Sequence, residues 1–186
     1  MSRTVTPTGN QSIYLAGIAW LIASSANFQA LTGSASAAAA LVHVPTESDD
    51  SETTGSTRPR AIVASAGSFK SNRISLNQFR PSGAVWVSFE FAPSAAVHAE
   101  GPLEDRLWDE MTEFLNRVDL VLTDVVAANG TGLGYLQIAG GESQVAFDSF
   151  ELIDGPFQLH EVRGEGSAGE NPAYCYAEVF EFAWLH

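Results

Sequence analysis

Cys175 is the only cysteine in this chain of 186 residues, so it is the first candidate for nucleophilic chemistry. A cysteine nucleophile needs a nearby base and a lowered pKa. Cys175 lies in "AYCYAEVFEFAW", between two tyrosines of a strand-like run, and no histidine is close to it in sequence. Unpaired cysteines are among the most often buried residues. We therefore expect Cys175 to be a small apolar residue of the core.

The other chemistry-bearing residues carry weaker signals. The four histidines are His43, His98, His160 and His186, and they share no metal-ligand spacing such as H-x-x-x-H. The glycine-rich "NGTGLGY" (129–135) follows a predicted helix, so it lacks the helix start that holds a phosphate. Glu178 and Glu181 interrupt an aromatic strand, where charges that deter aggregation are commoner than a catalytic carboxylate. We expect no catalytic residue, no cofactor and no metal.

The distribution of charge is more informative. The formal net charge of −13 disfavours binding to DNA or anionic lipid unless the cations cluster. From Arg58 to Arg80 the chain holds five cations and no acid, whereas residues 81–186 hold 18 acids and three cations. The five cations are Arg58, Arg60, Lys70, Arg73 and Arg80. One interpretation is a solvated face with incidental clustering; our hypothesis is a head-to-tail subunit contact that closes into a ring, with charge setting its register.

Residues 12–33, "SIYLAGIAWLIASSANFQALTG", form the most apolar stretch. Its apolar run is about half of the ~20 residues that a membrane span needs. The run suits a signal peptide in length, but no clear small-x-small cleavage site follows it. We predict instead a soluble helix that Ser12 caps and Gly33 ends. Since this helix is apolar nearly all round, we expect a second partner such as another subunit, with Tyr14 and Trp20 as candidate interface residues.

The remaining elements predict a single α+β domain over residues 1–186. Strands are expected at 60–67, 84–92, 134–139, 144–153 and 173–185, with a long helix at 102–130. A long acidic loop is expected at 45–60, and a variable strand or loop insertion at 68–83. Strands and helices do not alternate regularly along the chain, as they would in a parallel sheet. This order therefore predicts an antiparallel β-sheet with an N-terminal helix and one long central helix packed on one face.

Strand 84–92 has the clearest pattern. Val85, Val87 and Phe89 are expected on one face, and Trp86, Ser88 and Glu90 on the other, as in a half-buried antiparallel strand.

The order of the elements also resembles a known family. A first apolar helix with "AWL", a long loop, a strand "VWVSFEF", a long second helix and a final strand "YCYAEVFEFAW" are similar to the tail terminator (tail completion) proteins of long-tailed bacteriophages. The resemblance implies a non-enzymatic, typically hexameric ring of the virion, made in the host cytoplasm. It implies that the ring caps the tail tube and contacts the head-completion (stopper or adaptor) proteins, with double-stranded DNA passing through the lumen and no membrane involved.

The acidic composition suits that role, because cations that neutralise phosphates would hold the duplex in place. A stopper, tube or decoration protein would share most of these features. The alternative from another class is a small α+β enzyme or ligand-binding domain, with a pocket between the long helix and the sheet near Trp86, Tyr176 and Glu178.

Overall fold

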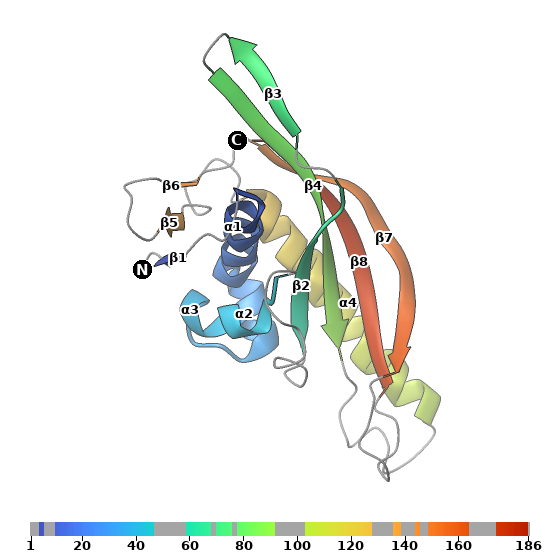
Figure 1. Cartoon of the computed structure of the whole chain (residues 1–186). Coiled ribbons are helices and arrows are strands. Elements are labelled where there is room, and N and C mark those ends of the chain that lie inside the picture. Colours follow the sequence, from blue (N-terminus) through green and yellow to red (C-terminus); the bar gives the residue numbers. More distant parts are fainter. Residues whose placement is uncertain are drawn as a thin grey trace.

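An antiparallel sheet with helices against one of its faces forms the body of the protein in a computed structural model (Figure 1). The structure describes the backbone at residues 4–5, 10–46, 59–67, 70–75, 78–91, 103–127, 136–138, 144–145, 149–163 and 174–185. It describes the side chains at 14–46, 59–67, 82–91, 109–127, 151–155 and 179–183. The predicted α+β class is confirmed.

The main sheet has the strand order β2-β4-β8-β7, with β3 paired to the first part of β4. Its strands are β2 (Arg60–Ser65), β3 (Lys70–Ser75), β4 (Gln78–Phe91), β7 (Ser149–Arg163) and β8 (Tyr174–Leu185). All of its pairs are antiparallel. A small separate sheet joins β1 (Thr4–Val5), β5 (Leu136–Ile138) and β6 (Gln144–Val145), with β1 parallel to β5.

Strand β4 shows the predicted alternation. Val85, Val87 and Phe89 are almost completely buried, whereas 47% of Trp86 is exposed. The buried residues of β2 and β8 are opposite these three residues, and partners in an antiparallel ladder point to the same side of the sheet. We call this side the core face; its buried residues are Ala61, Val63, Val85, Val87, Phe89, Phe180 and Phe182. The opposite side is the outer face.

Helix α1 (Asn10–Ser24) packs into the core that covers this face. Residues 15–23 are all buried, so the helix is enclosed nearly all round, as predicted. The enclosing residues come from its own chain, since α1 contacts β2, α2 and α4. Burial of α1 therefore requires no second subunit.

The single helix predicted for residues 12–33 is wrong in two respects. It begins at Asn10, so Ser12 lies within the helix and is not its N-cap, and it breaks at Ser25. Ser25 has extended backbone angles, and its hydroxyl accepts a hydrogen bond from the Phe28 amide, which makes it the N-cap of α2 (Ala26–Thr32). The two helices are bent by 80°. The break lets Phe28 enter the core, where it is fully buried. Gly33 ends α2 in the left-handed conformation, as predicted.

Within the described part of the chain, no single helix combines the length and the apolar character needed to cross a bilayer. Residues Tyr14–Ser24 and Ala26–Thr32 reach that length and composition only together, across their bend.

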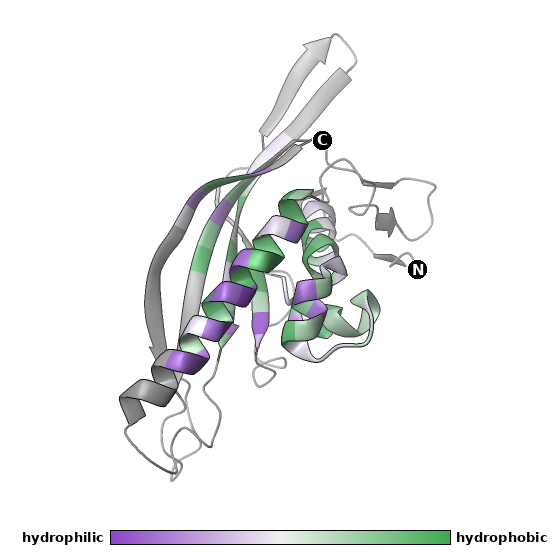
Figure 2. Ribbon diagram, turned by 180° about the vertical axis from the view of Figure 1, so that it is seen from behind, coloured by the Kyte–Doolittle hydropathy of each residue, from purple (hydrophilic) through white to green (hydrophobic). Residues whose placement is uncertain are grey.

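The long helix α4 (Leu103–Ala127) agrees with the prediction for residues 102–130 to within a few residues. Its buried stripe is Phe114, Val118, Val121, Leu122 and Val125. Figure 2 shows hydrophilic residues along the side of α4 that faces away from the sheet. The shorter helices α3 (Ala37–Ala40) and η1 (Leu41–His43) follow α2.

Aromatic rings connect these elements across the core. Phe89 of β4 makes edge-to-face contacts with Phe28 of α2 and Phe180 of β8, with ring centroids 6.4 and 6.0 Å apart. Phe91 stacks on Phe114 of α4 at 5.1 Å. Each such pair adds about 0.5–1.5 kcal/mol of stability beyond the burial of its rings. Because Phe89 contacts α2 and Phe91 contacts α4, strand β4 helps to position both helices.

The strand predicted at 144–153 is two strands in different sheets. Residues 144–145 form β6, and β7 begins at Ser149. Strand β7 also continues through Gly155-Pro156 to Arg163, well beyond the predicted end at residue 153. It does so through register shifts at Leu152/Asp154, Asp154/Phe157 and Phe157/His160, which absorb the turn-forming residues as bulges.

The two predicted insertions differ in outcome. Residues 47–58 of the acidic loop lie outside the described residues, whereas Pro45, Thr46 and Pro59 at its ends are placed. Within the stretch 68–83, residues 70–75 and 78–82 pair as antiparallel strands, β3 and the first part of β4, and we call this pair the hairpin.

Gly155 shows why β7 can bend at this point. Its φ is +123°, and a Cβ there would lie 2.9 Å from Cδ1 of Phe180 and 3.0 Å from the carbonyl oxygen of Val179. Only glycine combines this conformation with such a close approach to β8.

We predict that Gly155→Ala lowers the free energy of unfolding by about 3 kcal/mol, because it adds a clash with backbone to a strained φ. Urea denaturation measures the change. The matched control is Gly33→Ala: its φ is +66° but a Cβ there meets nothing within 4 Å, so only the conformational strain of about 1 kcal/mol is expected. Equal losses in the two variants would contradict the close approach.

Asp124 of α4 connects the bend at Ser25 to the long helix. Its Oδ2 accepts hydrogen bonds from the Ser25 hydroxyl at 2.6 Å, the Asn27 side-chain amide at 3.0 Å and the Asn27 backbone amide at 3.3 Å. Partial burial would raise the pKa of Asp124, but the hydrogen bonds from Ser25 and Asn27 outweigh it and lower the pKa below the ordinary value of 3.8.

Because the folded pKa of Asp124 is depressed, its contribution to stability is complete above 3.8 and is lost as the pH falls through the folded pKa. We predict that Asp124→Asn lowers the free energy of unfolding at pH 7 by about 1–3 kcal/mol. We also predict a smaller loss of stability on acidification than in the wild type. Asp119→Asn, at an exposed position of the same helix, is the control and should change neither quantity appreciably. Identical acid profiles for Asp124→Asn and the wild type would refute the assignment.

Candidate functional site

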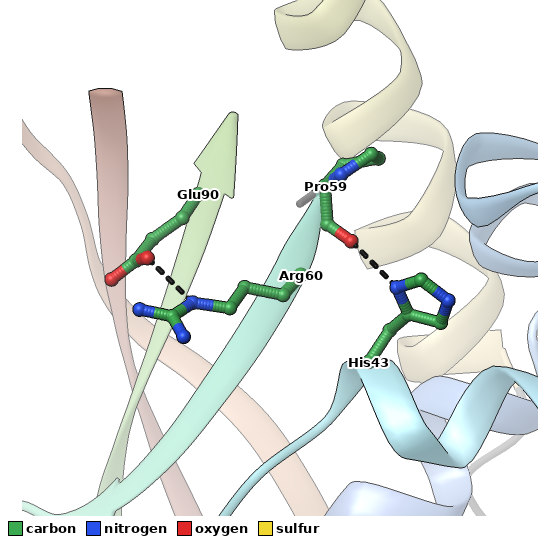
Figure 3. A network of polar contacts seen from close by, with 4 residues as sticks. All are labelled: His43, Pro59, Arg60 and Glu90. Carbon is green, nitrogen blue, oxygen red and sulfur yellow. Dashed lines mark hydrogen bonds and ion pairs between the residues drawn. The ribbon is translucent and has the colours of Figure 1, made fainter. Parts of the chain in front are cut away.

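Arg60, one of the five predicted interface cations, is engaged inside its own subunit. Its Nε donates a hydrogen bond to Oε2 of Glu90 at 2.7 Å, between neighbouring strands β2 and β4 (Figure 3). The two side chains are only 12% and 9% exposed. Arg60 therefore has little surface or charge left to offer a neighbouring copy.

The residue before Arg60 is also held. Nδ1 of His43 lies 3.0 Å from the carbonyl oxygen of Pro59, which joins η1 to the start of β2 (Figure 3). On the other side of the acidic loop, the Val63 amide donates to the Pro45 carbonyl at 3.1 Å, and Thr46 forms a bridge with Val63. Both ends of the 47–58 loop are thus anchored beside β2.

Three of the other cations lie on the hairpin. In the register of β3 and β4, Lys70 is opposite Ser82, Arg80 is opposite Asn72, and Arg73 is opposite Phe79. Their side chains, and all of Arg58, lie outside the described residues. The basic segment thus separates into an internal ion pair and a basic hairpin.

The hairpin extends beyond the rest of the sheet. From Ser82 onward β4 pairs with β8, whereas the positions of β4 before Ser82 pair with β3 alone in the described ladders. Figure 1 shows this end of β4 and the whole of β3 projecting from the body of the protein.

Among the residues whose side chains are described, Trp86 is the largest exposed apolar one on the outer face. In the ladder it lies between Ala64 of β2 and Glu181 of β8, and Glu181 is opposite Asp154 of β7. Glu151 is in the next row of the same face, opposite Ala183. Asp154 and Glu151 are exposed and Glu181 is half-buried. Trp86 is thus presented to solvent with Glu181 beside it on β8, and with Asp154 and Glu151 one strand further away on β7.

The two aromatic interface candidates of α1 lie against the core. Trp20 is 9% exposed and belongs to the buried cluster, so little of it remains for another subunit. Tyr14 is half-buried and packs against that cluster; burial raises the pKa of its phenol. The exposed Trp86 was predicted to point outward from β4 and to line a pocket, but it was not predicted as an interface residue.

A pocket of about 400 Å³ opens between α2, α4 and the end of β4. It is lined by Ala30, Leu31, Pro59, Phe91, Glu110, Glu113, Phe114 and Arg117. This is not the pocket suggested near Trp86, Tyr176 and Glu178. Trp86 is on the outer face, whereas Glu178 is opposite Phe89, a core-face position.

Potential catalytic groups do not converge among the described residues. No group of three or more His, Cys, Asp or Glu side chains there is arranged to hold a metal ion. Cys175 is opposite Val162 in the ladder, and His160 is opposite Ala177, which makes Cys175 and His160 diagonal neighbours on one face. Diagonal backbone positions are about 7–8 Å apart, and the side chains of both residues lie outside the described residues.

The chain was compared with known families and proteins. No family model matches it, and no curated protein matches it significantly. The function is therefore inferred from the geometry and from the resemblance in element order.

We predict that Arg60→Met lowers the free energy of unfolding by about 3 kcal/mol, because the buried Glu90 carboxylate then loses the Arg60 guanidinium that neutralises it. The double variant Arg60→Met with Glu90→Met should recover much of this loss, since it removes both charges. The control is Arg117→Met, which breaks the exposed pair with Glu113 and should change stability by less than about 1 kcal/mol. If Arg60→Met is no more harmful than Arg117→Met in urea denaturation, the pair is not structural.

Proposed function

We propose that the protein is a structural, ring-forming virion protein of the tail terminator or neck type. In this proposal it caps the tail tube of a long-tailed bacteriophage and joins it to the head-completion proteins. Six copies surround a lumen through which double-stranded DNA passes, as the resemblance implies.

The observation that carries the proposal is the combination of an exposed outer sheet face and a hairpin that projects beyond the sheet. A small domain normally covers both faces of a sheet or keeps the uncovered face polar. Here the outer face presents Trp86, while the projecting hairpin pairs only with itself in the described ladders. Both features favour association between copies.

The charge of the chain also supports this role. The formal net charge of −13 makes the surface repel the phosphates of DNA. The described cations are partly used internally: Arg60 pairs with Glu90, and Arg117 pairs with Glu113. A lumen lined by such a protein lets the duplex slide instead of holding it.

The proposal predicts a closed oligomer of defined copy number. Native mass spectrometry and negative-stain electron microscopy of the purified chain, from about 1 to about 100 µM, should show a ring whose population grows with concentration. A chain that remains monomeric over this range would contradict the proposal.

A second candidate, a ligand-binding domain, is supported by the pocket beside α4. Its volume of about 400 Å³ lies in the range of small-molecule sites, and Glu110, Glu113 and Arg117 supply polar groups beside Phe91 and Phe114. A monomer whose melting temperature rises saturably with a small molecule, and fails to do so after Phe91→Ala, would favour this candidate over the ring.

A further inference from the structure

The projecting hairpin lacks the support that the rest of the sheet has. We define it as Lys70–Ser75 together with residues 78–82. Between Gln78 and Pro81, β4 pairs with β3 alone in the described ladders, and β3 pairs with no other described strand. Two strands by themselves are marginally stable in water. A further surface against the hairpin would therefore stabilise it.

The charge of the hairpin restricts what that surface can be. Residues 70–82 read "KSNRISLNQFRPS", with three cations and no acid. In the ladder Lys70 is opposite Ser82, and Arg80 is opposite Asn72. Lys70 and Arg80 therefore occupy positions on the same face of the hairpin. A complementary surface must be acidic.

The outer face supplies such a surface around its exposed tryptophan. We call it the Trp86 surface, and it consists of Ala64, Trp86, Glu151, Asp154, Glu181 and Ala183. It carries three carboxylates and no cation. Neither ion pair found among the described side chains, Arg60–Glu90 or Arg117–Glu113, uses one of these carboxylates. An exposed tryptophan beside them also suits contact with an arginine.

The hairpin cannot reach the Trp86 surface of its own subunit. Strand β4 is continuous from Gln78 to Phe91, so the hairpin points away from Trp86 along the strand. Arg80 precedes Trp86 by six positions, about 20 Å of extended chain, and Lys70 is opposite Ser82, four positions or about 14 Å before Trp86. Only a second copy can bring a hairpin to this surface.

We propose that the hairpin of one copy docks on the Trp86 surface of the next, in a head-to-tail contact. The inference rests on the proposed ring and names the surfaces that build it. The patches are different on each subunit, so the contact is heterologous and closes into a ring when the rotation between copies permits it. Opposite charges set the register, and Trp86 supplies apolar area at the centre.

A charge swap tests the contact. Variant A carries Lys70→Glu and Arg80→Glu, and variant B carries Glu151→Lys and Glu181→Lys. Each alone should weaken assembly about tenfold or more and reduce its dependence on salt. An equimolar mixture of A and B should assemble again with the two variants alternating, because each hairpin then meets a complementary surface. Native mass spectrometry resolves the composition of these oligomers.

Controls separate this contact from the ring itself and from folding. Asp109→Lys with Asp119→Lys makes the same change of charge as variant B at exposed positions of α4, and should assemble like the wild type. Circular dichroism and the urea midpoint verify that each variant is folded. Rings of A and of B as stable as wild-type rings would overturn the docking inference and leave the ring intact. A wild type that stays monomeric would overturn the ring and, with it, this contact.

Discussion

The alternation of side chains along β4 is the constraint on which the rest of the structure depends. A period of two residues places Val85, Val87 and Phe89 in the core and Trp86 on the outer face. A shift of one residue would reverse both faces at once, so the register with β2 and β8 is strongly determined. Because the same strand continues into the hairpin, β4 also determines where the basic residues are presented.

The helices pack against the core face that this alternation creates. Helix α1 is enclosed by its own chain, and its continuation is turned by the Ser25 cap so that Phe28 meets Phe89. Asp124 joins this bend to α4 by accepting hydrogen bonds from two residues at the turn. The apolar N-terminal segment is thus an internal part of the fold, whereas the outer face and the hairpin are not covered by the described helices.

Charge has two roles in this molecule, and tertiary structure separates them. Arg60 is close to the hairpin cations in sequence, but its pairing with Glu90 makes it part of the sheet. Lys70, Arg73 and Arg80 belong to the projecting hairpin instead. A cluster that is continuous in the sequence is therefore divided in space. For the proposed ring, the described residues then offer a basic hairpin and, among their acidic surfaces, the Trp86 surface.

Local patterns were sufficient for the α+β class, the alternation of β4, the extent of α4 and the stop at Gly33, because periodicity and caps act within a few residues. Long-range contacts decided the rest. The helix bends at Ser25 because Phe28 and Asp124 hold the turn, and β7 continues through Gly155 because β8 lies against it. Likewise, the pairing of Arg60 with Glu90, 30 residues away in sequence, could not be predicted from the local cluster of cations. Such pairings depend on the register between strands, which tertiary structure alone establishes.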